Sequence, residues 1–442
     1  MRVKKGHKYP LVDISKYLKP PTRKETYRFG EPQITKLESG LTIITERLKT
    51  KENCKTMGYV GSGWLCDGKK FNLAHLVEHL VVPDEGEEAA DALSKVDSYV
   101  NGEVNPHYTG FEISVRSPFM SLAVAILADV LFNPEINAEK FLNEQKVVLN
   151  ENGRSMDSDT VEIYIETLLR NKVWNGHPYV RDLNEMGDIT LADVKRFISC
   201  HYVPSNIVVS CAGRLSHEKV LRQLERAVST IQKKEISKKE IGYAKYKPSV
   251  LSMKGKTELT YVIFAAEANP QDYTRGFFTT KVLSELLEKK LFSRIRINNG
   301  LDYDPNVNYN YESKGGLLFL NFAVSPKNVK QVIDLVKEEL HKLRTLRNYF
   351  TQDEINSYRL GVLSSAFQGF DDPLIRAEHN GLISVYGKGF IPYDEFIRRF
   401  LEVDQGDLYE EVNKIFALNK LSLVVAGSRT PNEDVLKELL YK

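Results

Sequence analysis

One ten-residue stretch decides how this chain is interpreted: Phe71-Asn-Leu-Ala-His75-Leu-Val-Glu78-His79-Leu80. Its leucines and valine recur at three- and four-residue intervals, which predicts an amphipathic helix over residues 72–80. On such a helix His75 and His79 lie about one turn apart and project from the same face. Both imidazoles can therefore reach a single point beside the helix.

Two imidazoles on one helical face are suited to binding a metal ion. Zinc accepts histidine nitrogens at about 2.0–2.1 Å. Glu78 follows His75 by three residues, so its carboxylate lies beside the same face. A carboxylate there can take a proton from water whose pKa a metal ion has lowered to about 7. The His-x-x-Glu-His spacing is found among zinc proteases. The alternative is a helix whose histidines only satisfy hydrogen bonds in a protein core.

A catalytic zinc site needs a third protein ligand and one open coordination position. The candidate ligand is Glu151, which ends the stretch Asn143-Glu-Gln-Lys-Val-Val-Leu-Asn-Glu151 within a helix predicted over 137–151. Glu144 precedes it by seven residues, or two helical turns, and so lies on about the same face. From there it can orient a ligand histidine or help to handle protons. The alternative for two glutamates on a charged helix is simple solvation.

The composition is that of an ordinary globular protein. The 442 residues allow two or three domains, and 42% hydrophobic and 27% charged residues exclude a disordered or fibrous chain. Lysine and arginine number 61 and aspartate and glutamate 59, so the chain has no overall positive field for nucleic acid or an anionic membrane. The four cysteines form no CxxC pair, which argues against a disulfide framework and a cysteine-based metal site and suits a reducing compartment.

Neither a secretory signal nor a membrane span is expected. Residues 1–30 carry early lysines without an apolar stretch behind them, so we interpret them as a solvated N-terminal arm. The longest apolar run, 122–132, is shorter than the ~20 residues that a membrane span needs, and it contains Asp129. It is better interpreted as a core helix. We therefore expect a cytoplasmic protein, with the mitochondrial matrix as the alternative in a eukaryotic source.

Strand and helix patterns alternate along the chain. Strands are expected at 41–45, 112–115 and 207–213, and helices at 72–80, 89–96, 119–131, 137–151 and from 191, after a Thr190 cap. Each half ends with a helix followed by an apolar strand and a glycine, and the strand and glycine lie at 205–213 and 421–427. Between the halves, Lys, Glu, Gly and Pro cluster at 231–248. The expected fold is α+β, with a metal-binding domain at 31–230, a linker at 231–248 and a related domain at 249–442.

Together these motifs resemble those of the pitrilysin/insulinase family of zinc metallopeptidases, in particular the branch of half-length chains that includes mitochondrial processing peptidase and its bacterial and archaeal relatives. In that family a His-x-x-Glu-His helix is followed by a glutamate in an E-x6-E pattern, and here Glu151 falls 72 residues after His79. The resemblance implies two domains, each a mainly antiparallel sheet packed with helices. It also implies one zinc ion per chain held by His75, His79 and Glu151, with Glu78 as general base and Glu144 as a supporting acidic residue.

The resemblance continues into the second half. Leu291-Phe-Ser-Arg-Ile-Arg296 followed by Gly300-Leu-Asp-Tyr303 looks like the family's LFxxLRxxxGLxY signature. Arg296 and Tyr303 are seven residues apart, as the family's substrate-binding pair are. A guanidinium and a phenol can hold a peptide carbonyl and stabilise an oxyanion. The alternative is that Arg296 caps a helix and that Tyr303 packs in a core.

Two segments depart from the family's pattern. Val81-Val-Pro-Asp-Glu-Gly follows the motif helix, where the family has a Phe-x-Gly-Thr-like stretch. The family's Asn-Ala-x-Thr segment, which binds substrate backbone on an edge strand, is matched by Val104-Asn-Pro-His-Tyr-Thr109, so Asn105 is the candidate equivalent. Pro106 there lacks the N–H that an edge strand would offer. These departures bear on substrate preference and cleft shape more than on the metal.

The resulting hypothesis is a zinc-dependent endopeptidase that hydrolyses peptides or small unfolded polypeptides inside a closed chamber. The alternative is a non-catalytic assembly or binding subunit of the same family. Such members commonly lose part of the His-x-x-Glu-His motif or the third glutamate, and this chain keeps both. Since half-length chains of the family generally pair, a homodimer is expected, with a heterodimer with a related subunit as the alternative. Neither nucleic acid nor a membrane is expected as a partner.

Overall fold

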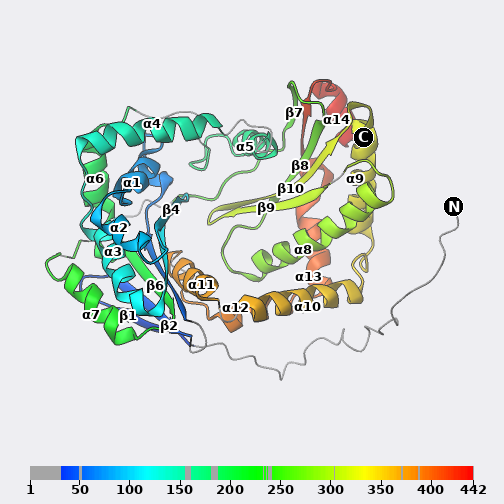
Figure 1. The fold of residues 1–442 in the computed structure, drawn as a ribbon. Coiled ribbons are helices and arrows are strands. Elements are labelled where there is room, and N and C mark those ends of the chain that lie inside the picture. Colours follow the sequence, from blue (N-terminus) through cyan, green and yellow to red (C-terminus); the bar gives the residue numbers. More distant parts are fainter. Residues whose placement is uncertain are drawn as a thin grey trace, which may run out of the picture.

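The computed structural model describes residues 31–48, 52–154, 161–180, 188–231, 233–234, 236, 241–302, 304–369, 372–386 and 389–441. These residues form two halves that lie side by side, each built on one sheet (Figure 1). The first sheet has the order β1 (Gln33–Lys36), β2 (Thr42–Arg47), β6 (Ile207–Gly213), β3 (Asn53–Val60), β5 (Thr109–Arg116) and β4 (Val100–Val104). The second has the order β7 (Val250–Lys254), β11 (Ser422–Gly427), β8 (Thr260–Ala268), β10 (Gly315–Val324) and β9 (Asn306–Glu312).

The two sheets repeat one topology. In each, the strand that closes the half pairs in parallel with an early strand, β6 with β2 and β11 with β7, and the other neighbours are antiparallel. Apart from β1, each strand of the first sheet has a counterpart at the same place in the second. The predicted α+β fold of two related, mainly antiparallel domains is therefore confirmed. The predicted strand at 207–213 has the observed bounds, and all seven of its residues are buried.

Helices cover both sheets. Those of the first half are α1 (Leu73–Val81), α2 (Glu88–Ser94), α3 (Met120–Phe132), α4 (Ala138–Arg154), α5 (Val161–Val173), α6 (Leu191–His201) and α7 (His217–Val228). Those of the second half are α8 (Arg275–Leu291), α9 (Val329–Thr345), α10 (Gln352–Gly369), α11 (Pro373–Val385), α12 (Tyr393–Leu401), α13 (Gln405–Ile415) and α14 (Glu433–Tyr441). Within the described ranges, every helix is too short or too polar to span a lipid bilayer.

Local sequence explains several of these helices. The apolar run at 122–132 is the core helix α3, most of whose side chains are buried against the first sheet. Gly58 of β3 leaves room for it, because a Cβ atom there would lie 2.7 Å from Leu131. The Thr190 cap of α6 is present as a capping box in which Thr190 and Asp193 exchange hydrogen bonds with each other's backbone N–H.

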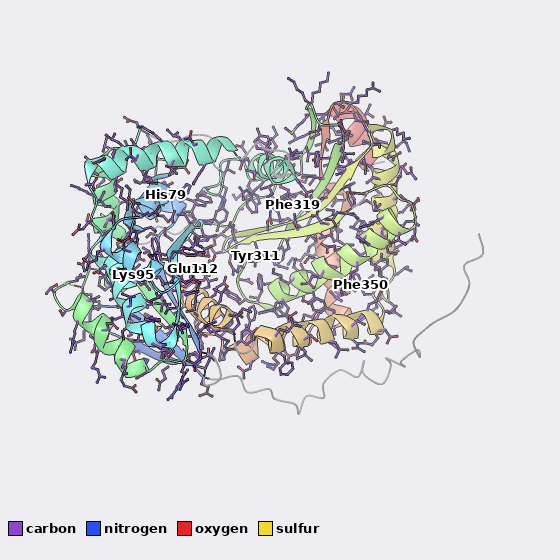
Figure 2. The ribbon with its side chains drawn as sticks, viewed as in Figure 1. His79, Lys95, Glu112, Tyr311, Phe319 and Phe350 are labelled. Carbon is purple, nitrogen blue, oxygen red and sulfur yellow. The ribbon has the colours of Figure 1, made fainter. Side chains whose placement is uncertain are left out.

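One helix from each half packs on the sheet of the other half (Figure 1). Helix α5 belongs to the first half of the chain but packs on the second sheet, where Ile165 and Leu169 join a core with Leu317 and Phe319. Figure 2 shows Phe319 on the second sheet beside α5. Helix α11 belongs to the second half and packs on β2, β3 and β6 of the first sheet. The predicted linker at 231–248 lies between the strands of the first sheet and those of the second, and α5 and α11 each pack on the sheet of the other half.

A buried ion pair fixes α11 on the first sheet. Arg376 donates through Nε to both carboxylate oxygens of Glu46, at 3.0 Å, and Asn380 donates to Glu46 at 2.9 Å. Both charged side chains are 1% exposed. Removing one partner of such a pair typically costs about 3–5 kcal/mol, because the other charge is left buried. The contact therefore holds the two halves together.

The described part of the linker is docked rather than free in solvent. Ala244 donates its N–H to the carbonyl of Lys314 at 2.8 Å, at the turn between β9 and β10. The Tyr246 hydroxyl lies 3.0 Å from the carbonyl oxygen of Ala265 and 2.7 Å from the Ser422 hydroxyl, both in the second sheet. These contacts, with the exchanged helices, join the two halves at several separate places.

Candidate metal centre

Helix α1 presents the motif from a buried position at the edge of the first sheet. Its apolar side, Leu73, Leu76, Val77 and Leu80, is buried in the first core, which confirms the predicted helix and its orientation. Asn72 precedes the helix with a left-handed φ of 66°, and Asp67 accepts the N–H of Ala74 at 2.8 Å. This bond satisfies one of the N–H groups that a helix leaves unpaired in its first turn. The opposite side of the helix is left to carry the polar residues.

Three donor atoms converge beside α1. Nε2 of His75 lies 3.3 Å from Nε2 of His79, and Oε2 of Glu151 lies 3.5 Å from the first and 3.4 Å from the second. Ligands bound at 2.0–2.2 Å to a tetrahedral ion are separated by about 3.3–3.6 Å. The three spacings match that geometry, and two imidazoles with one carboxylate are a donor set that zinc uses. The residues therefore fit the implied zinc ion, and they leave one tetrahedral position for another ligand.

Helix α4 brings Glu151 and Glu144 to this place. Lys140, near the N-terminus of α4, joins this helix to the end of α1: its Nζ donates to the carbonyl of Val82 at 2.6 Å and lies 3.1 Å from the carboxylate of Asp84. Phe141 and Val148 are buried in the first core. The register that buries these residues points the two glutamates toward α1, as the seven-residue spacing predicts. In Figure 2 His79 lies in the first half, beneath α4 in this view.

Glu144 sits behind one of the two histidines. Its Oε2 is 2.9 Å from Nδ1 of His79, the ring nitrogen that faces away from the donor triangle. A carboxylate at Nδ1 holds that nitrogen protonated and directs the lone pair of Nε2 toward a metal ion. Glu144 is thus placed to orient His79, a candidate metal ligand, in one of the two roles that its spacing predicts.

Glu78 is the fifth ionisable group of the centre. It is 8% exposed, and its Oε2 lies 3.8 Å from Nε2 of His79. The pKa of Glu78 is raised to about 7, chiefly by burial; His79 opposes the rise, and the carboxylates of Glu151 and Glu144 contribute to it. A bound cation would favour the charged form and lower this pKa. A carboxylate with such a pKa can both accept and release a proton near neutral pH.

The edge strand β4 lies directly against Glu78. A Cβ atom at Gly102 would lie 1.8 Å from Oε1 of Glu78, so the absence of a side chain there makes room for the carboxylate. Since β4 is the last strand of its sheet, one of its backbone edges has no partner strand among the described residues. Sequence reasoning missed Gly102. The sequence pattern that could have indicated its role is a glycine within a short strand of alternating polarity, because such a glycine often lies where another group approaches the backbone closely.

Asn105 lies at the bend between β4 and β5 and not on the edge strand itself. Its N–H donates to the carbonyl of Tyr108 at 2.9 Å, and its carbonyl accepts the N–H of Trp64 at 3.2 Å. The edge strand is formed by the preceding residues, with Asn101 and Gly102 at its centre. The structure therefore places Asn105 apart from the position that the predicted substrate-binding asparagine would take, and leaves its role a prediction.

The predicted substrate anchors belong to the second half. Arg296 lies in a π-helical segment, Phe292–Ile297, that continues α8, and its guanidinium stands over the ring of Phe292 at 5.0 Å. Gly300 follows with a left-handed φ of 61°, where the chain turns. Tyr303 lies outside the described residues. The Arg296 and Tyr303 pair therefore stays a prediction.

Comparisons with known proteins match most of the chain. The family model of the insulinase family (peptidase family M16) matches residues 42–185, and the model described as the peptidase M16 inactive domain matches residues 188–362. A protein named "uncharacterized zinc protease" from Rickettsia bellii is 23% identical over 410 residues, which cover 89% of this chain and 97% of the relative. A protein of that description from Streptomyces coelicolor is 24% identical over 371 residues, which cover 79% of each.

Solved structures show the same fold. The crystal structure of a peptidase M16 inactive domain from Pseudomonas fluorescens has a TM-score of 0.79 at 16% sequence identity, and the match covers 91% of this chain and 99% of that one. A protease from Helicobacter pylori has a TM-score of 0.76 at 16% identity, with coverage of 90% and 100%. With M16 models that match residues 42–185 and 188–362 and a relative matched along 97% of its length, the chain belongs to the insulinase family of peptidases, family M16.

Proposed function

We propose that the protein is a zinc-dependent endopeptidase that hydrolyses peptides or small unfolded polypeptides. One observation carries the proposal: the donor atoms of His75, His79 and Glu151 lie 3.3–3.5 Å from one another, the spacing that tetrahedral zinc requires. Glu78, on the same helix, supplies a buried carboxylate beside them. The candidate donors and the candidate general base are thus found together, whereas a purely structural subunit would have no use for the set.

The roles of the residues follow from their positions. Zinc, when bound, supplies Lewis acidity, which polarises a carbonyl and makes water a nucleophile near neutral pH. Glu78 takes the proton of the attacking water and returns it to the nitrogen of the leaving amine. Glu144 holds His79 in one orientation and one tautomer throughout. Arg296 and Tyr303 are the proposed anchors of the substrate and of the developing oxyanion.

Strand β4 is the proposed docking site for the peptide backbone. An extended peptide can add to an open sheet edge through main-chain hydrogen bonds, which are independent of side-chain identity. Gly102 on that strand lies against Glu78, so a peptide paired with β4 would pass directly by the general base. This mode of binding suits an endopeptidase that accepts unfolded chains of varied sequence.

Pairing of two chains around a closed chamber completes the proposal. Glu151 is exposed over 45% of its side chain, so a single chain leaves the centre open on one side. A second copy of the chain would enclose that side and restrict access to small or unfolded substrates. Mass measurement in solution tests the pairing, and a monomer at the concentrations used for activity would contradict it.

Metal analysis and a peptide assay test the enzyme itself. Purified protein should contain one zinc ion per chain and cleave quenched fluorescent peptides, a chelator should abolish cleavage, and added zinc should restore it. A His75→Ala variant should lose both zinc and activity. Absence of zinc together with absence of chelator-sensitive cleavage would contradict the proposal and favour the non-catalytic subunit.

A further inference from the structure

The bend that joins β4 to β5, residues 105–108, is a place where the two halves touch. His107 at this bend has its Nε2 atom 2.8 Å from the Tyr179 hydroxyl and 3.0 Å from the hydroxyl of Ser313. Ser313 lies in the turn between β9 and β10, in the second half of the chain. The two hydroxyls are 3.2 Å apart, so the three polar groups form a closed triangle across the junction.

Tyr179 holds this triangle together from the loop that follows α5. Its ring is 1% exposed and packs edge-on against Trp64, and its hydroxyl accepts the N–H of Lys314 at 3.1 Å. The ring of His107 also meets Tyr386, at the end of α11, with 6.0 Å between the ring centroids. The bend therefore contacts buried or hydrogen-bonded side chains from both halves, in addition to its own sheet.

The same bend is tied to the segment that leads into α1. Trp64 donates its N–H to the carbonyl of Asn105 at 3.2 Å, and Leu65 donates to the carbonyl of Pro106 at 3.1 Å. His107 follows Gly102, the residue that lies against Glu78, by five positions. A shift of the bend would therefore move β4 relative to the general base.

We propose that His107, Tyr179 and Ser313 form a positioning cluster through which the second half holds β4 in place for the substrate. The inference rests on the proposed function, because β4 is the proposed docking strand. All the proposed zinc donors come from the first half, so loss of the cluster should leave the metal in place. It should instead loosen β4 and weaken the binding of peptide. None of the three residues takes part in the chemistry.

The test uses variants that each remove one polar group. Tyr179→Phe and Ser313→Ala delete a hydroxyl, His107→Leu deletes the ring nitrogen, and His107→Gln keeps a polar atom near the place of Nε2. Thr35→Val is the matched control. Thr35 lies on β1, the strand at the opposite edge of the first sheet, and its hydroxyl is 2.9 Å from Nε2 of His217. Ser313→Ala, at a half-buried turn, keeps the test available if His107→Leu fails to fold.

Two measurements then test the role of the cluster: hydrogen exchange in β4 and affinity for peptide. Hydrogen exchange of the amides in Val100–Val104 is independent of activity, and it should become faster in Tyr179→Phe and Ser313→Ala but not in Thr35→Val. Affinity for the quenched peptide, measured by fluorescence on a Glu78→Gln background that does not cleave it, should fall about 3- to 10-fold, as expected for one lost hydrogen bond. His107→Gln should restore much of the affinity, and zinc content should stay at the wild-type level throughout.

Opposite results would overturn the proposal in distinguishable ways. Unchanged β4 exchange and unchanged peptide affinity in Tyr179→Phe and Ser313→Ala, beside an active wild type, would overturn this inference alone. An equal loss of affinity in Thr35→Val would show a general effect of lost hydrogen bonds and would overturn it too. If the wild type neither binds nor cleaves peptides, the proposed function falls, and the substrate role of the cluster falls with it.

Discussion

Oε2 of Glu144 lies 2.9 Å from Nδ1 of His79, on the side of the ring that faces away from the candidate metal centre. The contact joins α4 to α1 and gives the histidine a single tautomer, with its Nε2 lone pair directed at the donor triangle. Glu151, two turns further along the same helix, closes that triangle. One helix therefore carries both a candidate ligand and the carboxylate that contacts another candidate ligand.

A Glu144→Gln variant should bind zinc more weakly without losing the site. The amide oxygen can still accept the N–H of His79, but its negative charge is gone, so the imidazole becomes a poorer ligand. We expect zinc affinity to fall about 10- to 100-fold, the usual effect of losing such a partner. Competition with a fluorescent chelator measures it. Glu139→Gln, an exposed glutamate on the same helix, is the control, and equal affinities in the two variants would contradict the role of Glu144.

A Glu78→Gln variant should keep zinc and lose hydrolysis. The amide is nearly isosteric with the carboxylate but cannot take a proton from water, so kcat should drop by about 10²–10⁴. Zinc content and KM should change little, because Glu78 is not among the three donors at tetrahedral spacing. Glu88→Gln, at an exposed position on α2, serves as the control. Cleavage at the wild-type rate by Glu78→Gln would remove the general base from the mechanism.

Glu312, at the end of β9, should make stability depend on pH. Burial raises its pKa to about 7, although Arg170 of α5 opposes the rise. The folded chain then holds a proton that the unfolded chain has released, so stability falls as the pH rises from the ordinary glutamate range toward the raised value. Over that window the loss is about 1–3 kcal/mol.

Replacing this carboxylate should flatten the profile. Glu312→Gln has no proton to lose, so its thermal midpoint should decline less than that of the wild type between about pH 5 and pH 8. The exposed Glu267, on β8, gives the matched control as Glu267→Gln. Parallel midpoint curves for wild type and Glu312→Gln would show that this carboxylate titrates alike in the folded and unfolded chain.

Local patterns in the sequence predicted those parts of the structure that local forces determine. The helix expected at 72–80 is observed at Leu73–Val81, and the strand expected at 207–213 has those bounds. Periodic apolar residues and a capping threonine act over a few residues, so they can be interpreted without a fold. Helical spacing likewise indicates that His75 and His79 share one face and that Glu144 and Glu151 share another, although it does not show that the two faces meet.

The remaining features depend on tertiary contacts that no local pattern encodes. The exchange of α5 and α11 between the halves is invisible in their sequences, since an apolar helical face is the same whichever sheet it covers. Asn105 was singled out from a motif, whereas the edge strand lies at Val100–Val104. The close approach of Gly102 to Glu78 joins residues on two elements, and only the folded chain brings them together.

That approach leads to the last prediction, at Gly102. A side chain there would place its Cβ 1.8 Å from Oε1 and 2.9 Å from Cγ of Glu78, so the carboxylate of Glu78 would have to leave its present position. Gly102→Val should therefore lower kcat by at least the ~10²-fold that general-base catalysis contributes. Zinc binding should persist, because His75, His79 and Glu151 are not displaced by a change in β4.

The expected signature is zinc at wild-type stoichiometry, a cooperative thermal transition and little cleavage of the quenched peptide. Gly255→Val is the control, because a Cβ atom at Gly255, just after β7, meets nothing within 4 Å. Substantial cleavage by Gly102→Val would mean that Glu78 works from another position, reached when the substrate binds. Loss of zinc in that variant would mean instead that β4 supports the metal donors themselves, which would extend the role of the edge strand from the general base to the whole centre.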